Sequence, residues 1–232
     1  MRACHPDSDG TVVRNGVAIR FERYGQGRPA ILLLPAWSLV HSRHWKMQVP
    51  YLARHFTVVC FDGRGNGGSG RPAEATAYTD GQFALDALAV MDAAGIESAV
   101  LVSLSRGALW SLLLCAEHPD RVLGSVFIAP TASLVPPLAE RRVQRFDEVI
   151  DGPVGWQTYN AHYWKTHYPE FVTFFAGRIF TEPHSTKQTE DAIRWALEID
   201  GETLAGSGHF PHARDPVRVN LLIKQFADRV RQ

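Results

Sequence analysis

The stretch Val102-Ser103-Leu104-Ser105-Arg106-Gly107-Ala108 decides the fold, because it places a serine between two apolar segments of different character. Residues 98–103 are short, aliphatic and β-branched, which is typical of a buried parallel strand. Residues 106–118 repeat apolar side chains on one helical face. A strand that turns sharply into a helix exposes the hydroxyl of Ser105 if the flanking residues are small. Gly107 meets that requirement, whereas Ser103 is small without being glycine.

Other apolar runs predict the rest of an α/β sheet. The expected buried strands are residues 30–34, 57–61, 99–103 and 123–128. Residues 11–24 predict an N-terminal hairpin that turns at Asn15-Gly16. A helix over residues 80–94 lies between two of the strands, which predicts right-handed crossovers and a mostly parallel sheet. A last helix is expected from Asp215, with Pro216 at its first position.

Residues 134–205 have a different pattern and divide the chain. Aromatic side chains recur there at helical spacing, in the pairs Tyr159 with Tyr163, Trp164 with Tyr168, and Phe171 with Phe175. Because no strand pattern interrupts them, we expect a helical cap over the mouth of a site. The aromatic side chains form either a hydrophobic substrate box or a helix-packing core. The expected domains are a core of residues 1–133, the cap of 134–205, and residues 206–232.

The turn at Ser105 resembles the nucleophile elbow of the α/β-hydrolase family. Three further segments resemble that family and occur in its order: the glycine-rich turn over 61–72, the link over 116–122, and the loop Gly206-Ser207-Gly208-His209. The resemblance implies an α/β-hydrolase sheet with a helical cap. It also implies that residues 206–232 present a catalytic histidine and return to the core with a C-terminal helix.

The resemblance assigns roles to four residues. A serine hydroxyl needs a neighbouring base before it attacks a carbonyl, and histidine suits that task near neutral pH. Ser105 is the expected nucleophile and His209 the expected base. The oxyanion donors are the backbone N–H groups of Arg106 and Trp37. In the loop before Trp37, proline and alanine replace the usual His-Gly and remove the freedom of a glycine.

A serine triad also needs a carboxylate that orients the histidine. In the family this acid follows a late strand, and a further strand then leads to the histidine. Only residues 204–208 join the cap to His209 here, whereas a βαβ unit takes roughly 30 residues. The other position used by some relatives, residues 129–131, holds no carboxylate. The nearest acids upstream are Asp200 and Glu202.

Three explanations remain open for this short connection. The acid is missing, Asp200 or Glu202 substitutes for it, or the chain is a shortened form of a longer one. We favour an internal deletion relative to the family, at the late-strand edge. The sheet should then end at the strand over 123–128 and leave an exposed edge. We expect no carboxylate within hydrogen-bond reach of His209, so esterase activity should be weak. The exposed edge should make folding marginal.

Composition limits the partners. Lys plus Arg and Asp plus Glu balance at 24 each, so neither nucleic acid nor an anionic membrane is an expected partner. The apolar runs are too short to span a bilayer, and the first ten residues do not form a signal peptide. Three scattered cysteines favour reduced thiols in the cytoplasm. The expected partner is a small acyl substrate, and the sequence specifies no oligomeric state.

Two patterns that suggest cofactors or metals are weak. Gly63-x-Gly65-x-x-Gly68 follows a strand and matches a dinucleotide-binding fingerprint, but it continues as a turn instead of opening a helix. His162, His167 and His184 have spacings that put no two of them on one helical face, as a metal pair would need. We therefore expect no cofactor and no metal.

The sequence favours a cofactor-independent serine hydrolase that forms an acyl-enzyme on Ser105. Its substrate would be a small ester, thioester or lactone. A serine at this position argues against haloalkane dehalogenases and epoxide hydrolases, which need an aspartate. The alternative is a catalytically impaired, hydrolase-like protein that binds a ligand or regulates a partner. Turnover of an activated ester by Ser105 separates the two.

Overall fold

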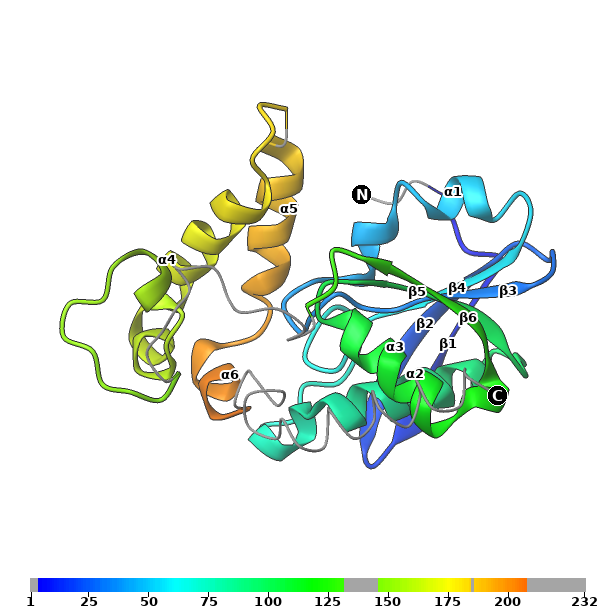
Figure 1. Ribbon diagram of the computed structural model, residues 1–232, viewed down its shortest axis with the longest axis horizontal. Coiled ribbons are helices and arrows are strands. Elements are labelled where there is room, and N and C mark those ends of the chain that lie inside the picture. Colours follow the sequence, from blue (N-terminus) through cyan, green and yellow to red (C-terminus); the bar gives the residue numbers. More distant parts are fainter. Residues whose placement is uncertain (1–3, 132–145, 185, 208–232) are drawn as a thin grey trace, which may run out of the picture.

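Six strands form one sheet in the order β1-β2-β4-β3-β5-β6 (Figure 1). The computed structural model describes residues 4–131, 146–184 and 186–207. β2 pairs antiparallel with both β1 and β4, whereas β4, β3, β5 and β6 pair parallel with one another. The bounds are β1 Ser8–Arg14, β2 Val17–Tyr24, β3 Ala30–Leu33, β4 Thr57–Phe61, β5 Ala99–Leu104 and β6 Val122–Ile128. The predicted α/β class with a mostly parallel sheet is confirmed.

The N-terminal hairpin turns at the two residues that the sequence predicted. Asn15 and Gly16 both have positive φ, at 49° and 76°. A two-residue turn with positive φ at both positions matches the twist of the strands that it joins. β1 and β2 therefore pair along their whole length, from Arg14 opposite Val17 to Ser8 opposite Arg23.

Helices cover both faces of the sheet (Figure 1). α2 (Asp80–Ala93) and α3 (Gly107–Glu117) pack on one face, and η1 (Ser42–Trp45) and α1 (Val49–Leu52) pack on the other. Strand β4 shows the alternation that a two-sided core requires. Its residues Val59 and Phe61 belong to the cluster under α2 and α3, whereas Val58 and Cys60 belong to the cluster under α1. Both faces of β4 are thus buried, as its continuous apolar run predicted.

The glycine-rich segment after β4 forms turns and does not open a helix. Gly65 and Gly67 have φ of 85° and 54°, which suits glycine. Arg64, in the same turn, is fully buried, and its guanidinium donates to both carboxylate oxygens of Asp86 at 2.7 Å. Such bidentate pairs combine charge with fixed geometry. The turn is therefore fixed to α2. Two short helices complete the core, η2 (Ala75–Tyr78) before α2 and η3 (Pro119–Arg121) before β6.

Residues 146–207, here called the helical segment, contain only helices and turns in their described part (Figure 1). Its elements are η5 (Gly155–Thr158), α4 (Ala161–Ile179), α5 (Thr186–Ala196) and α6 (Gly201–Ser207). α4 begins at Asn160, whose side-chain oxygen accepts the N–H groups of His162 and Tyr163. The predicted helical character is therefore found, but one detail of the resemblance was wrong. Gly206 and Ser207 lie in α6, so they do not belong to a loop.

β6 is the last strand of the described sheet. Its exposed apolar residues are Leu123, Val126, Phe127 and Ile128. The outer edge of β6 pairs with no other described strand, and the expectation that the sheet of the chain ends there stays a prediction. The predicted helix from Asp215 lies outside the described residues.

Candidate active site

Ser105 occupies a strained turn between β5 and α3. Its φ is +52°, a left-handed conformation that few residues other than glycine adopt. The strand ends at Leu104 and the helix begins at Gly107, so only two residues make the turn. The side chain of Ser105 is partly exposed, unlike that of Ser103. The backbone therefore turns sharply at the serine and leaves its hydroxyl accessible.

Close packing explains the small residues on both sides of Ser105. A Cβ on Gly107 would lie 2.4 Å from the carbonyl oxygen of Pro35, which is a backbone clash. Ser103 is fully buried, and its hydroxyl donates to the carbonyl of Val126 on β6 at 3.3 Å. A serine is thus accommodated where the family usually has glycine, because its one polar group finds a partner.

The last residue of β6 and the segment after it hold Ser105 at three points. The N–H of Ser105 donates to the carbonyl of Ile128 at 3.0 Å, and the N–H of Thr131 donates to the carbonyl of Ser105 at 3.1 Å. The hydroxyls of Ser105 and Thr131 are also hydrogen-bonded, with 3.1 Å between their oxygens. Ala129, between these contacts, has a φ of +42°. Residues with positive φ thus follow both strands, Ser105 directly after β5 and Ala129 directly after β6.

The loop after β3 is fixed to the start of α3. The N–H of Gly107 donates to the carbonyl of Ala36 at 3.2 Å. Trp37 follows Ala36 and Arg106 precedes Gly107, so this bond joins the neighbours of both expected oxyanion donors. Their role as donors stays a prediction. The structure brings the two residues to the same end of the sheet as Ser105, at the carboxyl ends of β3 and β5.

A buried carboxylate fixes the side chain of Arg106. Asp80, the first residue of α2, accepts two hydrogen bonds from the Arg106 guanidinium, both at 2.9 Å. It accepts a third from the indole N–H of Trp110 at 2.7 Å. Asp80 is 7% exposed, so this pair is largely shielded from water. Asp80 was not among the predicted site residues, although the sequence places an aspartate at the start of the expected helix.

The helical segment packs against the same loop through aromatic rings. Trp37 stacks on Tyr159 with ring centres 6.3 Å apart, and it meets Phe175 edge-on at 5.3 Å. Trp164 contacts Trp37 at 6.5 Å. Offset and edge-on pairs of this kind add to the free energy gained from burial. The helical segment thus packs on Trp37, in the loop that is bonded to the start of α3.

Polar contacts join α5 to the core. Asp191 is buried and pairs with Lys46, the residue after η1, at 2.9 Å and with Lys187. Burial raises the pKa of the Asp191 carboxyl, but hydrogen bonds from the two lysines outweigh it and lower the pKa to about 2. The side chain of Asn66, in the turn after β4, donates to the carbonyl of Trp195 at 3.0 Å. Two separate loops of the core therefore hold α5.

The two candidate acids, Asp200 and Glu202, lie at the start of α6. Both carboxylate oxygens of Asp200 accept from Thr203, from its N–H at 2.7 Å and its hydroxyl at 2.8 Å. The N–H bond is the main cause that lowers the pKa of Asp200. Asp200 thus caps the first turn of α6, whereas Glu202 is exposed. His209 lies outside the described residues, so its bonding to either acid stays a prediction.

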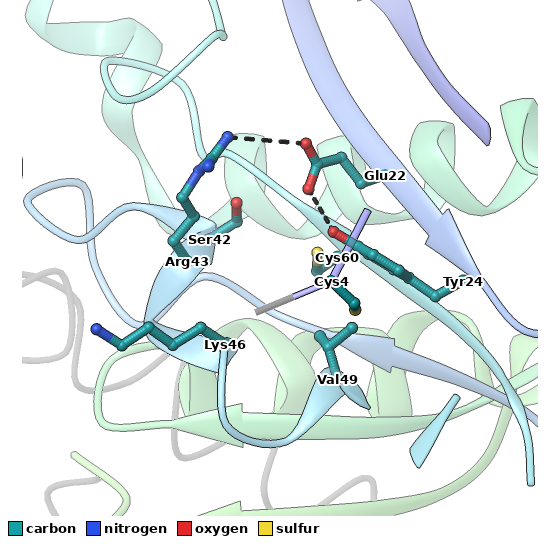
Figure 2. Close-up of a pocket in the computed structure, with 8 residues that line it drawn as sticks. All are labelled: Cys4, Glu22, Tyr24, Ser42, Arg43, Lys46, Val49 and Cys60. Atoms are coloured by element: carbon teal, nitrogen blue, oxygen red, sulfur yellow. Dashed lines mark hydrogen bonds and ion pairs between the residues drawn. The ribbon is translucent and has the colours of Figure 1, made fainter. Parts of the chain in front are cut away.

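One pocket lies away from Ser105, on the face of the sheet covered by α1 (Figure 2). In it the hydroxyl of Tyr24 donates to Glu22 at 2.6 Å, and a guanidinium nitrogen of Arg43 lies 3.9 Å from the same carboxylate. Burial raises the pKa of the Cys60 thiol and of the Tyr24 phenol. Both groups therefore keep their protons at neutral pH. Its lining residues are Cys4, Glu22, Tyr24, Ser42, Arg43, Lys46, Val49 and Cys60.

The described residues hold no group of three His, Cys, Asp or Glu side chains placed as metal ligands would be. The Nε2–H of His162 donates to the carbonyl of Asp147 at 3.0 Å, and His167 Nδ1 is hydrogen-bonded to the hydroxyl of Thr166. Within the same described part, no helix is both long enough and apolar enough to cross a bilayer.

The sequence matches the model of the alpha/beta hydrolase fold over residues 29–162. The chain belongs to the α/β-hydrolase fold family. Matched residues include β3 to β6 and the turn at Ser105, which are the parts that build the site.

Curated relatives of this α/β hydrolase match only part of their own length. This chain is 29% identical over 126 residues to 3-oxoadipate enol-lactonase 2 of Acinetobacter baylyi, and the match covers 54% of this chain and 46% of that protein. It is 36% identical over 143 residues to epoxide hydrolase A of Mycobacterium tuberculosis, over 58% of this chain and 42% of that protein. The chain thus spans less than half the length of either relative.

Solved structures share the fold over a larger part. The enol-lactonase of Burkholderia xenovorans superposes with a TM-score of 0.65 at 22% identity, over 85% of this chain and 71% of that chain. A bromoperoxidase of Bacillus anthracis gives 0.65 at 21% identity, over 86% and 72%. At these identities the likeness concerns the fold alone.

Proposed function

We propose that this α/β hydrolase is a cofactor-independent serine hydrolase of small esters, thioesters or lactones. The observation that carries the proposal is the conformation of Ser105, which has a φ of +52° at the turn from β5 to α3. Strain at a polar, partly exposed residue suggests a functional constraint, because a relaxed turn would be more stable. The partial match to an enol-lactonase favours a lactone or a related acyl compound.

In the proposed reaction the Ser105 hydroxyl attacks the carbonyl carbon while His209 removes its proton. The N–H groups of Trp37 and Arg106 bind the negative charge that develops on the carbonyl oxygen. His209 then returns the proton to the leaving group, and an acyl-enzyme remains on Ser105. Water, activated by His209, attacks the acyl carbon, and Ser105 is regained as a free hydroxyl.

We also propose that residues 134–205 act as the cap over this site. Support comes from the contacts of Trp37 with Tyr159, Trp164 and Phe175, which place aromatic rings of the helical segment beside an oxyanion loop residue. An aromatic wall favours substrates with an apolar acyl or alcohol part. In this arrangement the rings serve both as packing core and as substrate wall.

A catalytically impaired, ligand-binding or regulatory protein is the second candidate. One observation favours it: both oxygens of Asp200 are engaged by Thr203, so this acid already caps a helix. Loss of the orienting acid costs about 10⁴ in turnover, while the oxyanion donors alone retain some catalysis. This second candidate function includes the proposal that the triad acid is absent.

A serine-directed fluorophosphonate tests the nucleophile. We expect covalent labelling of the wild-type chain and no labelling of Ser105→Ala. Ser103→Ala is the matched control, because Ser103 is buried and its hydroxyl is bonded to Val126. Labelling that persists in Ser105→Ala would refute the assignment. Steady turnover of p-nitrophenyl acetate then separates an efficient hydrolase from an impaired one.

A further inference from the structure

We propose that Thr131 is a further catalytic residue, whose hydroxyl donates a hydrogen bond to Ser105 Oγ and assists its departure from the acyl-enzyme. The contact is direct, with 3.1 Å between the two hydroxyl oxygens. Thr131 can have this role only if Ser105 is the nucleophile proposed above.

The backbone places the Thr131 side chain. Its N–H donates to the carbonyl of Ser105 at 3.1 Å, and the N–H of Ser105 donates to the carbonyl of Ile128 at 3.0 Å. Through these two bonds, the N–H of Ser105 is tied to the end of β6 and its carbonyl is tied to the segment that follows β6. The hydroxyl contact is the third bond of the same set. Thr131 therefore meets the reacting oxygen in a position fixed by backbone geometry, not by a mobile side chain alone.

Chemistry decides which hydroxyl donates. A hydroxyl has one proton and two lone pairs. When Ser105 attacks, its proton must point to a base, and a threonine hydroxyl does not take up a proton at neutral pH. In the reactive arrangement Ser105 therefore donates to the base and accepts from Thr131. One lone pair of Oγ is then left to attack the carbonyl.

The bond from Thr131 affects the two half-reactions differently. Before acylation it already stabilises the free hydroxyl of Ser105, so much of its contribution cancels between ground state and transition state. In the acyl-enzyme, Oγ is an ester oxygen and a poorer acceptor. As the deacylation intermediate collapses, the bond between the acyl carbon and Oγ breaks and its electron pair moves to Oγ. The base returns the proton taken from water to Oγ, while Thr131 keeps its own proton.

Thr131 should therefore accelerate deacylation more than acylation. We expect Thr131→Val to slow deacylation about tenfold, which corresponds to about 1.4 kcal/mol, and to change acylation by less than about threefold. Valine keeps the shape of threonine and removes only the hydroxyl. Acetyl-enzyme should accumulate in this variant, with a larger burst of p-nitrophenolate and a lower steady rate.

The experiment follows the acetyl adduct on Ser105 by intact mass after p-nitrophenyl acetate is added and then removed. Its rates of appearance and loss give acylation and deacylation separately. Thr131→Ser should restore the wild-type lifetime, because it keeps the hydroxyl. Thr11→Val is the matched control, since Thr11 is exposed on β1 at the opposite edge of the sheet. Circular dichroism checks the fold of each variant, and Thr131→Ala replaces Thr131→Val if the latter does not fold.

The outcomes distinguish the two proposals. An adduct on wild-type Ser105 with an unchanged lifetime in Thr131→Val overturns the role of Thr131 and leaves the nucleophile intact. Failure of Thr131→Ser to restore the lifetime overturns it as well. No adduct on the wild-type chain, or an adduct that survives Ser105→Ala, overturns the proposed function and the role of Thr131 together.

Discussion

Replacing Asp80 by asparagine should destabilise the fold at the site, because it removes the charge that holds Arg106. Asp80 accepts two hydrogen bonds from Arg106 and one from Trp110. The side chains of this ion pair are only 11% and 8% exposed. Removing one partner of a fully buried pair costs 3–5 kcal/mol, because the other charge stays without a partner. For this nearly buried pair we expect a loss of about 3 kcal/mol in the free energy of unfolding.

Urea unfolding followed by circular dichroism measures this loss. Asp92→Asn is the matched control, since Asp92 also lies on α2 and also pairs with an arginine, Arg121, at 2.6 Å. Its side chain is 65% exposed, so we expect a change of less than about 1 kcal/mol. A double-mutant cycle with Arg106→Met should give a coupling of about 2 kcal/mol between Asp80 and Arg106. A loss in Asp80→Asn as small as that in Asp92→Asn, or no coupling, would refute the reasoning.

Two further predictions concern the loop after β3 and the helix η1. Gly107→Ala should lower the free energy of unfolding by about 2 kcal/mol and slow the labelling of Ser105, because the new Cβ clashes with the Pro35 carbonyl. Gly177→Ala is the control: its Cβ has open space on α4, so it should raise the melting temperature. Burial lowers the pKa of His44 from its ordinary value of 6.5 to about 3. Below pH 6.5 the unfolded state therefore binds a proton at His44 that the folded state does not, so the free energy of unfolding falls as the pH falls. Between pH 7 and pH 5 we expect the wild type to lose about 2 kcal/mol more than His44→Asn, measured by urea unfolding at each pH.

Local periodicity predicted the sheet well, because each strand contains its own information. β4 was predicted to the residue, and β6 differs by one residue at its start. A buried strand alternates between two apolar faces, so an uninterrupted apolar run is enough to find it. The serine turn was visible for the same reason, since a strand, a turn and a helix follow one another directly in the sequence.

Contacts between distant residues were not predictable in this way. Asp80 and Arg106 are 26 residues apart, and only the packing of α2 beside α3 brings them together. Residues 129–131 were considered only as a position for the triad acid, so the hydroxyl of Thr131 was not predicted to contact Ser105. Asp200 was considered as a triad acid, but the sequence Asp-Gly-Glu-Thr also has the pattern of a helix cap, and the structure uses Asp200 in that way.

The left-handed backbone of Ser105 has a consequence for how this position responds to selection. A residue with a side chain in this conformation is less stable than glycine by about 1 kcal/mol. Among variants chosen only for a stable fold, glycine should therefore displace serine at position 105. Variants chosen for acyl transfer should keep serine despite that cost. The residue found at this single position after random mutagenesis would thus report which of the two properties was under selection.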